Sequence, residues 1–107
     1  MEYLNRVQIR GKVGAVRLNE IHGIKVANFS VSTECLNEIS DGSLVNESTS
    51  FTVCGWQSEA KFNLEKLAKG DNVYVEGRFR TMKYTNHLGV EKVLYEIVAS
   101  SIELVED

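Results

Sequence analysis

The 107-residue sequence contains no proline, only two cysteines and no apolar run long enough to cross a membrane. No stretch is rich in proline or otherwise biased in composition, so the sequence predicts neither a linker nor a low-complexity tail. Cys35 and Cys54 form no CxxC pair and have no zinc-type histidine spacing, which indicates small thiols in a reducing compartment. The first residues lack the apolar region of a signal peptide. Together these absences predict a cytoplasmic protein.

Positive charge is also scarce, with 12 Lys and Arg against 15 Asp and Glu and a formal net charge of -3. This total counts mildly against a dedicated nucleic-acid binder, which usually carries a positive excess. The charges are nevertheless unevenly distributed along the chain. No Lys or Arg occurs between Lys25 and Lys61, whereas basic residues gather in Asn5–Val16 and Gly70–Asn86. A protein of negative net charge still binds a polyanion if its basic residues share one surface.

Length and composition predict a single domain over residues 1–107, with enough apolar residues for a modest core. Alternation with a period of two predicts five strands. These are Asn5–Val16, Lys25–Thr33, Phe51–Trp56, Val73–Met82 and Val90–Leu104. The spacing of Ala60, Leu64 and Leu67 predicts one helix over Ser58–Lys69, which Gly70 ends. This order predicts an all-β OB fold, a five-stranded Greek-key barrel with a helix between the third and fourth strands.

The connections between the predicted strands carry clear turn signals. His22-Gly23 predicts a tight hairpin turn, and Asn86–Gly89 predicts a second one with Gly89 in a left-handed conformation. The segment Glu34–Ser50 is rich in Ser, Asn, Asp and Glu and predicts a long acidic loop. Gly77 lies in the middle of a predicted strand, which indicates a sharp bend or a close approach of another backbone.

Nothing in the sequence points to an enzyme. Both histidines, His22 and His87, lie in predicted turns, and no nucleophile has a base near it in the sequence. The spacing of Cys, His, Asp and Glu does not indicate a metal site. We therefore predict no catalytic residue, no metal and no cofactor.

The segment Gly70–Asn86 carries the strongest pattern of the chain. Its alternation places Val73, Val75, Gly77, Phe79 and Thr81 on one face and Tyr74, Glu76, Arg78, Arg80 and Met82 on the other. Two arginines, followed by Lys83 and Tyr84, are a suitable surface for a phosphate backbone and a stacked base. An ordinary charged strand face in water explains the same residues and, on composition alone, is the commoner case.

Four segments at matching spacing resemble bacterial-type single-stranded DNA-binding proteins, from Asn5 to about Leu104. They are Asn5-Arg6-Val7 with Gly11-Lys12-Val13-Gly14, then Val26-Ala27-Asn28-Phe29-Ser30, then Lys69 to Arg78 with Arg80-Thr81 and Tyr84-Thr85, and finally Glu96-Ile97-Val98-Ala99. Each segment alone is a weak signal, but the four in order are specific.

The resemblance implies an OB-fold homo-oligomer, a dimer or tetramer, that binds single-stranded DNA in replication, recombination or repair without strong sequence preference. Binding is expected to combine a basic groove with stacking aromatics. The residues expected at this site are Arg10, Lys12, Trp56, Arg78, Arg80, Lys83 and Tyr84. Trp56 could equally cap the contact between the helix and the barrel. The first strand, Leu4–Val13, is expected to pair with its copy in a second subunit.

The sequence departs from the family pattern at several points. Leu36-Asn37, Ser48 and Cys54 stand where the family usually has stacking aromatics, so weaker binding is expected. The chain reaches only Glu106-Asp107, which predicts no acidic tail for recruiting repair or replication enzymes and resembles short relatives from mobile elements or primosomes. An OB-fold protein-interaction module with weak or no nucleic-acid binding is the alternative, and the acidic segment Glu34–Glu47 favours it.

Overall fold

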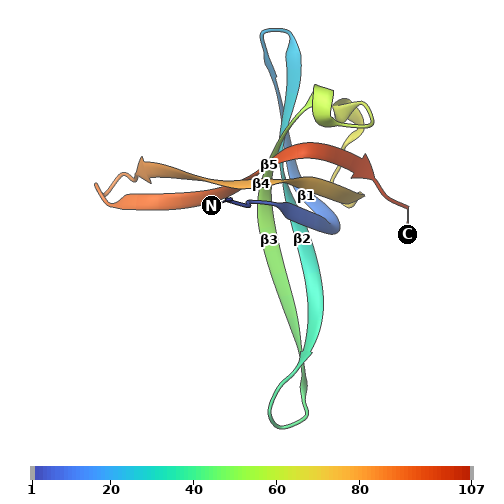
Figure 1. Ribbon diagram of the computed structural model, residues 1–107, viewed down its shortest axis with the longest axis vertical. Coiled ribbons are helices and arrows are strands. Elements are labelled where there is room, and N and C mark those ends of the chain that lie inside the picture. Colours follow the sequence, from blue (N-terminus) through green and yellow to red (C-terminus); the bar gives the residue numbers. More distant parts are fainter. Residues whose placement is uncertain (1, 107) are drawn as a thin grey trace.

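The computed structural model describes residues 2–106, which form five long strands wound into a closed barrel (Figure 1). The strands are β1 Val7–Ile21, β2 Ile24–Glu38, β3 Leu44–Trp56, β4 Asn72–Thr85 and β5 Glu91–Leu104. Their order around the barrel is β1-β2-β3-β5-β4. Every neighbouring pair is antiparallel except β3 and β5, which are parallel. The prediction of an all-β, five-stranded closed sheet is confirmed.

The barrel interior is filled by alternate residues of the strands, most of them β-branched. Val53, Val73, Val75, Ile97 and Ile102 are completely buried there. β-branched side chains pack well on a pleated surface, and burying each contributes about 1.5–3 kcal/mol. The period of two that predicts the strands therefore marks the residues that form the core.

The helix predicted over Ser58–Lys69 is wrong. The segment contains only two 3-10 turns, η1 Gln57–Glu59 and η2 Leu64–Lys66. Its backbone finds partners elsewhere, because the Lys61 amide donates to the Ile102 carbonyl at 2.9 Å and the Gln57 side chain accepts from the Leu64 amide at 2.9 Å. The spacing of the apolar residues did identify their burial, since Leu64 and Leu67 lie in the core.

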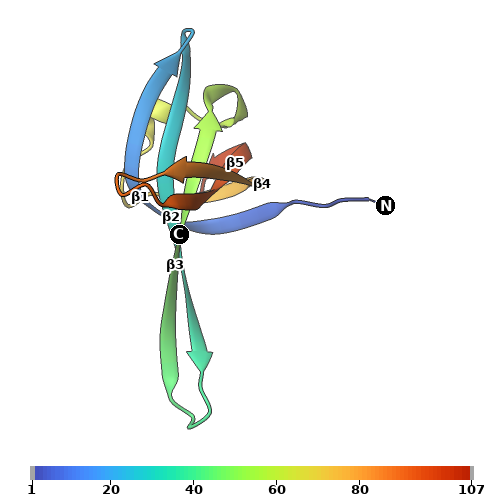
Figure 2. The ribbon, with the colours of Figure 1, turned by 90° about the vertical axis from the view of Figure 1, so that its left-hand side faces the viewer.

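The connection between β2 and β3 is a two-stranded ribbon, so the long loop predicted over Glu34–Ser50 is also wrong. Cross-strand pairing continues without interruption to Glu38 and Leu44, and only residues 39–43 form the loop. Gly42 has a φ of 85° in this loop. The ribbon projects from the barrel and is exposed on both faces, which removes the alternation from its sequence (Figures 1 and 2).

β1 changes its pairing partner along its length, and β4 bends at a register shift against β5. β1 pairs with β4 over its first half, from Val7 to Lys12, and with β2 from Lys12 onward. Within the described residues, the stretch from Val7 to Gly11 therefore has one edge without a strand partner. In β4 the register shifts between Glu76 and Gly77. A Cβ on Gly77 would lie 2.2 Å from the Val98 carbonyl oxygen, so the predicted close backbone approach is confirmed.

No helix among residues 2–106 has the length and apolar character needed to span a membrane.

Candidate nucleic-acid interface

The β4–β5 hairpin extends well beyond the barrel and presents one of its faces as a continuation of the barrel's outer surface (Figure 1). Val73 and Val75 of β4 point into the core, and the alternation turns Arg78, Arg80 and Tyr84 outward. The predicted division of this strand into two faces is confirmed. Three of the seven predicted site residues therefore share one face of one strand.

The two arginines of this face differ in their surroundings. Arg78 is exposed and forms no ion pair within residues 2–106. Arg80 donates from Nε to the Glu96 carboxylate at 2.8 Å, and its Nη2 contacts the same oxygen. Because Glu96 is only 6% exposed, Arg80 serves mainly to compensate a buried negative charge. Of the two arginines, Arg78 is the one that remains available to a phosphate.

Beyond the arginines, the outer face of the hairpin becomes apolar and aromatic. Tyr84 is 50% exposed, and Met82 and Leu94 form a cross-strand pair beside it, both partly exposed. Lys92 lies directly across from Tyr84. This surface combines a stacking ring with a nearby ammonium group, as single-strand binding requires. No local sequence signal points to Lys92, because only the register of the hairpin places it beside Tyr84.

Lys83 does not belong to this face. It pairs across the hairpin with Val93 and alternates with Tyr84, so its side chain projects from the opposite face. Its ammonium lies 3.8 Å from the Glu91 carboxylate, and both side chains are exposed. The placement of Lys83 with Arg78 and Tyr84 is therefore wrong, since the odd-numbered residues of β4 continue the core face.

Arg10 and Lys12 lie on the outer surface, but apart from the hairpin. They project from the first half of β1, where Arg10 pairs with Tyr74 and Lys12 with Asn72. Between them and Arg78 stands Glu76, which accepts a 2.6 Å hydrogen bond from the Tyr74 hydroxyl. That hydrogen bond holds the pKa of Glu76 below its ordinary value. A carboxylate thus lies between these two cations and Arg78 on the outer surface.

Trp56 ends β3 on the outer surface of the barrel. Its cross-strand partner is Val26, which is 3% exposed although it points away from the core. Cross-strand partners lie about 5 Å apart at Cβ, so Trp56 and Val26 are neighbours on this surface. Trp56 itself is only half-buried. Both roles considered for Trp56, a stacking platform and a packing residue, are compatible with this position.

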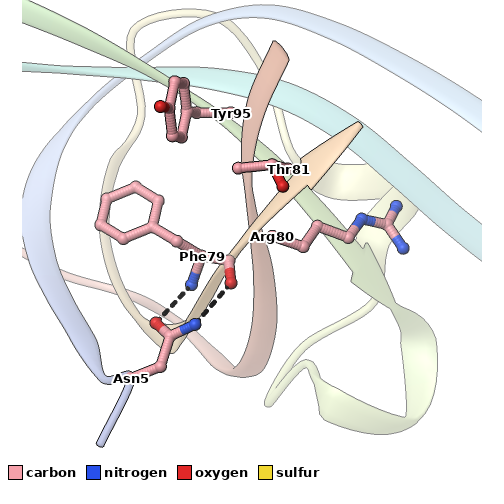
Figure 3. Close-up of a pocket in the computed structure, with 5 residues that line it drawn as sticks. All are labelled: Asn5, Phe79, Arg80, Thr81 and Tyr95. Carbon is pink, nitrogen blue, oxygen red and sulfur yellow. Dashed lines mark hydrogen bonds between the residues drawn. The ribbon is translucent and has the colours of Figure 1, made fainter. Parts of the chain in front are cut away.

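A pair of exposed aromatics lies on the opposite face of the hairpin. Phe79 and Tyr95 project to the same side of β4 and β5 over an open groove of about 640 Å³, whereas the side chain of Arg80 points away (Figure 3). The Asn5 side chain closes one end, donating to the Phe79 carbonyl at 2.7 Å and accepting from its amide at 3.0 Å. The alternation places Phe79 on the same face as the buried Val73 and Val75, but Phe79 is exposed because the hairpin extends beyond the barrel.

Cys54 lies near the centre of the outer surface, two residues before Trp56. Partial burial, with the nearby Glu96 carboxylate, raises the pKa of its thiol. The thiol is therefore protonated and neutral at pH 7. No group of three or more His, Cys, Asp or Glu side chains suited to a metal ion occurs in the part of the chain that the structure describes.

The chain matches the model of the single-strand binding protein family over residues 4–105. It is 31% identical over 106 residues to the single-stranded DNA-binding protein of Neisseria meningitidis. It is 30% identical over 105 residues to single-stranded DNA-binding protein 1 of Chlorobaculum tepidum. Each alignment covers 95% of this chain, but only 60% and 65% of the two relatives. The chain thus spans less than two-thirds of the length of these curated proteins.

Solved structures agree with this match. A complex of Plasmodium falciparum SSB with ssDNA superposes with a TM-score of 0.85 at 23% identity, covering 99% of this chain and 98% of the other. The small single-stranded DNA-binding protein of Streptomyces coelicolor gives a TM-score of 0.71 at 19% identity, covering 95% and 94%. At these identities the likeness concerns the fold.

Proposed function

Because the chain belongs to the single-strand binding protein family, we propose that it binds single-stranded DNA with little sequence preference, in replication, recombination or repair. The observation that carries this proposal is the outer face of the β4–β5 hairpin. There the unpaired Arg78 shares a face with Tyr84 and its apolar neighbours. A cation for phosphates and a ring for bases give affinity that does not depend on base identity.

Under this proposal, fewer of the predicted site residues contact the DNA directly. Arg78 and Tyr84 bind DNA directly. Arg80 lies beside the bound DNA, with its guanidinium paired to Glu96. Trp56 is retained as a second platform on the same outer surface. Arg10 and Lys12 are retained as peripheral cations, and Lys83 is left out, because it projects from the other face of the hairpin.

Self-association, location and the absence of catalysis complete the proposal. The open edge of β1 from Val7 to Gly11 supports a dimer or tetramer, because an unpaired strand edge readily pairs with another chain. We place the protein in the cytoplasm and assign it no reaction, because the relatives are bacterial proteins named for binding DNA.

The test is a titration of labelled oligo-dT with the protein at several salt concentrations. Affinity should fall as salt rises, because bound cations release counterions from the DNA. Arg78→Ala should weaken binding and flatten the dependence of log K on log salt by about 0.7. Lys66→Ala, on the 3-10 turn η2, removes an equal charge elsewhere and serves as the control. Failure of the wild-type protein to bind at low salt would overturn the proposal.

A protein-interaction module is the second candidate, and the β2–β3 ribbon favours it. The ribbon exposes Leu36 and Leu44 and carries Glu34, Glu38 and Glu47 without a single Lys or Arg. Such a surface repels DNA. A pull-down performed with and without nuclease separates the two candidates, since a partner held by the protein alone survives nuclease treatment.

A further inference from the structure

One residue from each of the five strands contributes to a continuous row across the outer surface of the barrel. This cross-strand row consists of Arg17 on β1, Asn28 on β2, Cys54 on β3, Val98 on β5 and Arg78 on β4, each paired in register with the next. The members point outward, because their chain neighbours Phe29, Val53 and Ile97 are buried in the core. With strands about 4.8 Å apart, the row spans about 19 Å along the sheet.

The far end of the row is a groove of mixed polar and apolar lining, which no local sequence pattern predicts. A register shift in β1 between Val13 and Val16 opens a hollow of about 300 Å³ beside Arg17. The polar side chains of Asn28, Ser30 and Thr52 line it together with Ala15, Val16 and Phe29, and no carboxylate does. Arg17 makes no ion pair within residues 2–106. The groove thus offers a free guanidinium beside hydroxyl and amide groups, which is the chemistry that binds a phosphate.

The middle of the row is electrically neutral. Asn28 and Val98 carry no charge, and the Cys54 thiol is protonated at neutral pH. The nearest acid is Glu96, whose carboxylate is covered by the Arg80 guanidinium. A polyanion that leaves Arg78 therefore meets no uncompensated negative charge before it reaches Arg17. The route past Arg10, in contrast, meets the Glu76 carboxylate.

We propose that single-stranded DNA crosses the outer surface along the cross-strand row, with one phosphate bound at Arg17 and another at Arg78. The inference rests on the proposed function and extends it, because it assigns the path of the strand and a phosphate site on β1. The bound DNA lies across β5, β3 and β2, over the Cys54 thiol.

The two cysteines allow this path to be mapped without changing the protein. Cys54 lies in the row, whereas Cys35 is exposed on the β2–β3 ribbon and points to the side that continues the core face. Alkylation by iodoacetamide at about pH 8.5, where thiolates form, is followed by mass spectrometry with and without saturating oligo-dT. Cys54 should be protected several-fold and Cys35 should react at the same rate in both samples. Equal protection of both thiols, or none at Cys54, would overturn the path.

Variants of Arg17 test the phosphate site. Arg17→Ala should weaken oligo-dT binding roughly fivefold at low salt and reduce the salt slope by about 0.7, whereas Arg17→Lys keeps the slope. Lys66→Ala is again the matched control, and urea unfolding checks that Arg17→Ala remains folded. Wild-type affinity and slope in Arg17→Ala would refute the site.

These experiments distinguish failure of the proposed function from failure of the cross-strand row. Absence of oligo-dT binding by the wild-type protein removes the proposed function and the row with it. Binding that leaves Cys54 unprotected and is unaffected by Arg17→Ala removes the row and leaves the function standing.

Discussion

The guanidinium of Arg80 covers the carboxylate of Glu96, with Nε donating at 2.8 Å and Nη2 contacting the same oxygen. The carboxylate is almost fully buried and the Arg80 side chain is 41% exposed. An arginine expected to bind DNA is thus engaged by its own protein. The ion pair makes the outer surface neutral at this point and leaves Arg78 as the arginine of this face with an uncompensated charge.

Arg80→Ala should therefore lower stability more than it lowers DNA affinity. Removing the guanidinium leaves Glu96 as an uncompensated buried charge, which costs about 3–5 kcal/mol when fully buried and, with this partial exposure, about 2 kcal/mol. Urea unfolding measures the loss. Arg78→Ala is the control and should change stability by less than about 0.5 kcal/mol, because Arg78 has no such partner.

A double substitution separates charge from packing. Adding Glu96→Gln to Arg80→Ala removes the buried charge and should restore most of the lost free energy. If the single and double variants unfold at the same urea concentration, the compensation of Glu96 by Arg80 is not what stabilises this region.

Residue patterns predicted the barrel because its strands bury one face. The alternation in β4 correctly divided its residues between two faces, and the turn residues Gly42 and Gly89 adopt the left-handed φ values that their loops require. The alternation predicts no strand where neither face of the strand is buried. The β2–β3 ribbon is exposed on both faces and has no alternation to detect.

The site was only partly predictable, since it depends on register between distant segments. Glu96 and Arg80 are sixteen residues apart and meet only when β4 and β5 pair. Arg17, Asn28 and Cys54 belong to three strands, and no local signal connects them. The predicted helix failed for a similar reason, because its backbone partner is Ile102 of β5.

Gly77→Ala should destabilise the barrel by roughly 1–3 kcal/mol. A methyl group there would lie 2.2 Å from the Val98 carbonyl oxygen, so β4 and β5 would have to separate at the bend. Gly89→Ala is the matched comparison. Its added methyl group meets nothing within 4 Å, and only its φ of 81° is unfavourable, at about 1–2 kcal/mol. Urea unfolding of both variants should show the larger loss for Gly77→Ala, and the reverse order would contradict the close approach.

Tyr84→Ala should weaken oligo-dT binding by about 1–3 kcal/mol without changing the salt slope, because a stacked ring carries no charge. Tyr95→Ala removes a 65% exposed tyrosine from the opposite face of the same hairpin and should leave affinity unchanged. Fluorescence anisotropy measures both. Equal losses in the two variants would show that the hairpin binds DNA through both faces.

The residues before β1 should contribute to self-association. Tyr3 and Leu4 are about 90% exposed and lead into the open edge of β1 (Figure 2). Tyr3→Ser combined with Leu4→Ser should shift light scattering toward the monomer, because the pair removes apolar surface beside the strand edge. Leu88→Ser, at the tip of the β4–β5 hairpin, removes another largely exposed leucine, at 74%, and should have no effect.

Tyr74→Phe should reduce the loss of stability in mild acid. The hydrogen bond from Tyr74 is the largest cause that lowers the pKa of Glu76 from its ordinary value of 4.5. A carboxyl whose folded pKa is lowered adds stability above its unfolded pKa, and this contribution disappears as pH falls through the folded value. Urea unfolding below pH 4.5 should therefore show a steeper fall for wild type than for Tyr74→Phe, and the carboxyl carbon of Glu76 should titrate at higher pH in the variant. Tyr95→Phe is the control, because its hydroxyl has no hydrogen-bond partner within residues 2–106. Parallel stability curves for wild type and Tyr74→Phe would mean that water replaces the tyrosine hydroxyl on Glu76 without cost.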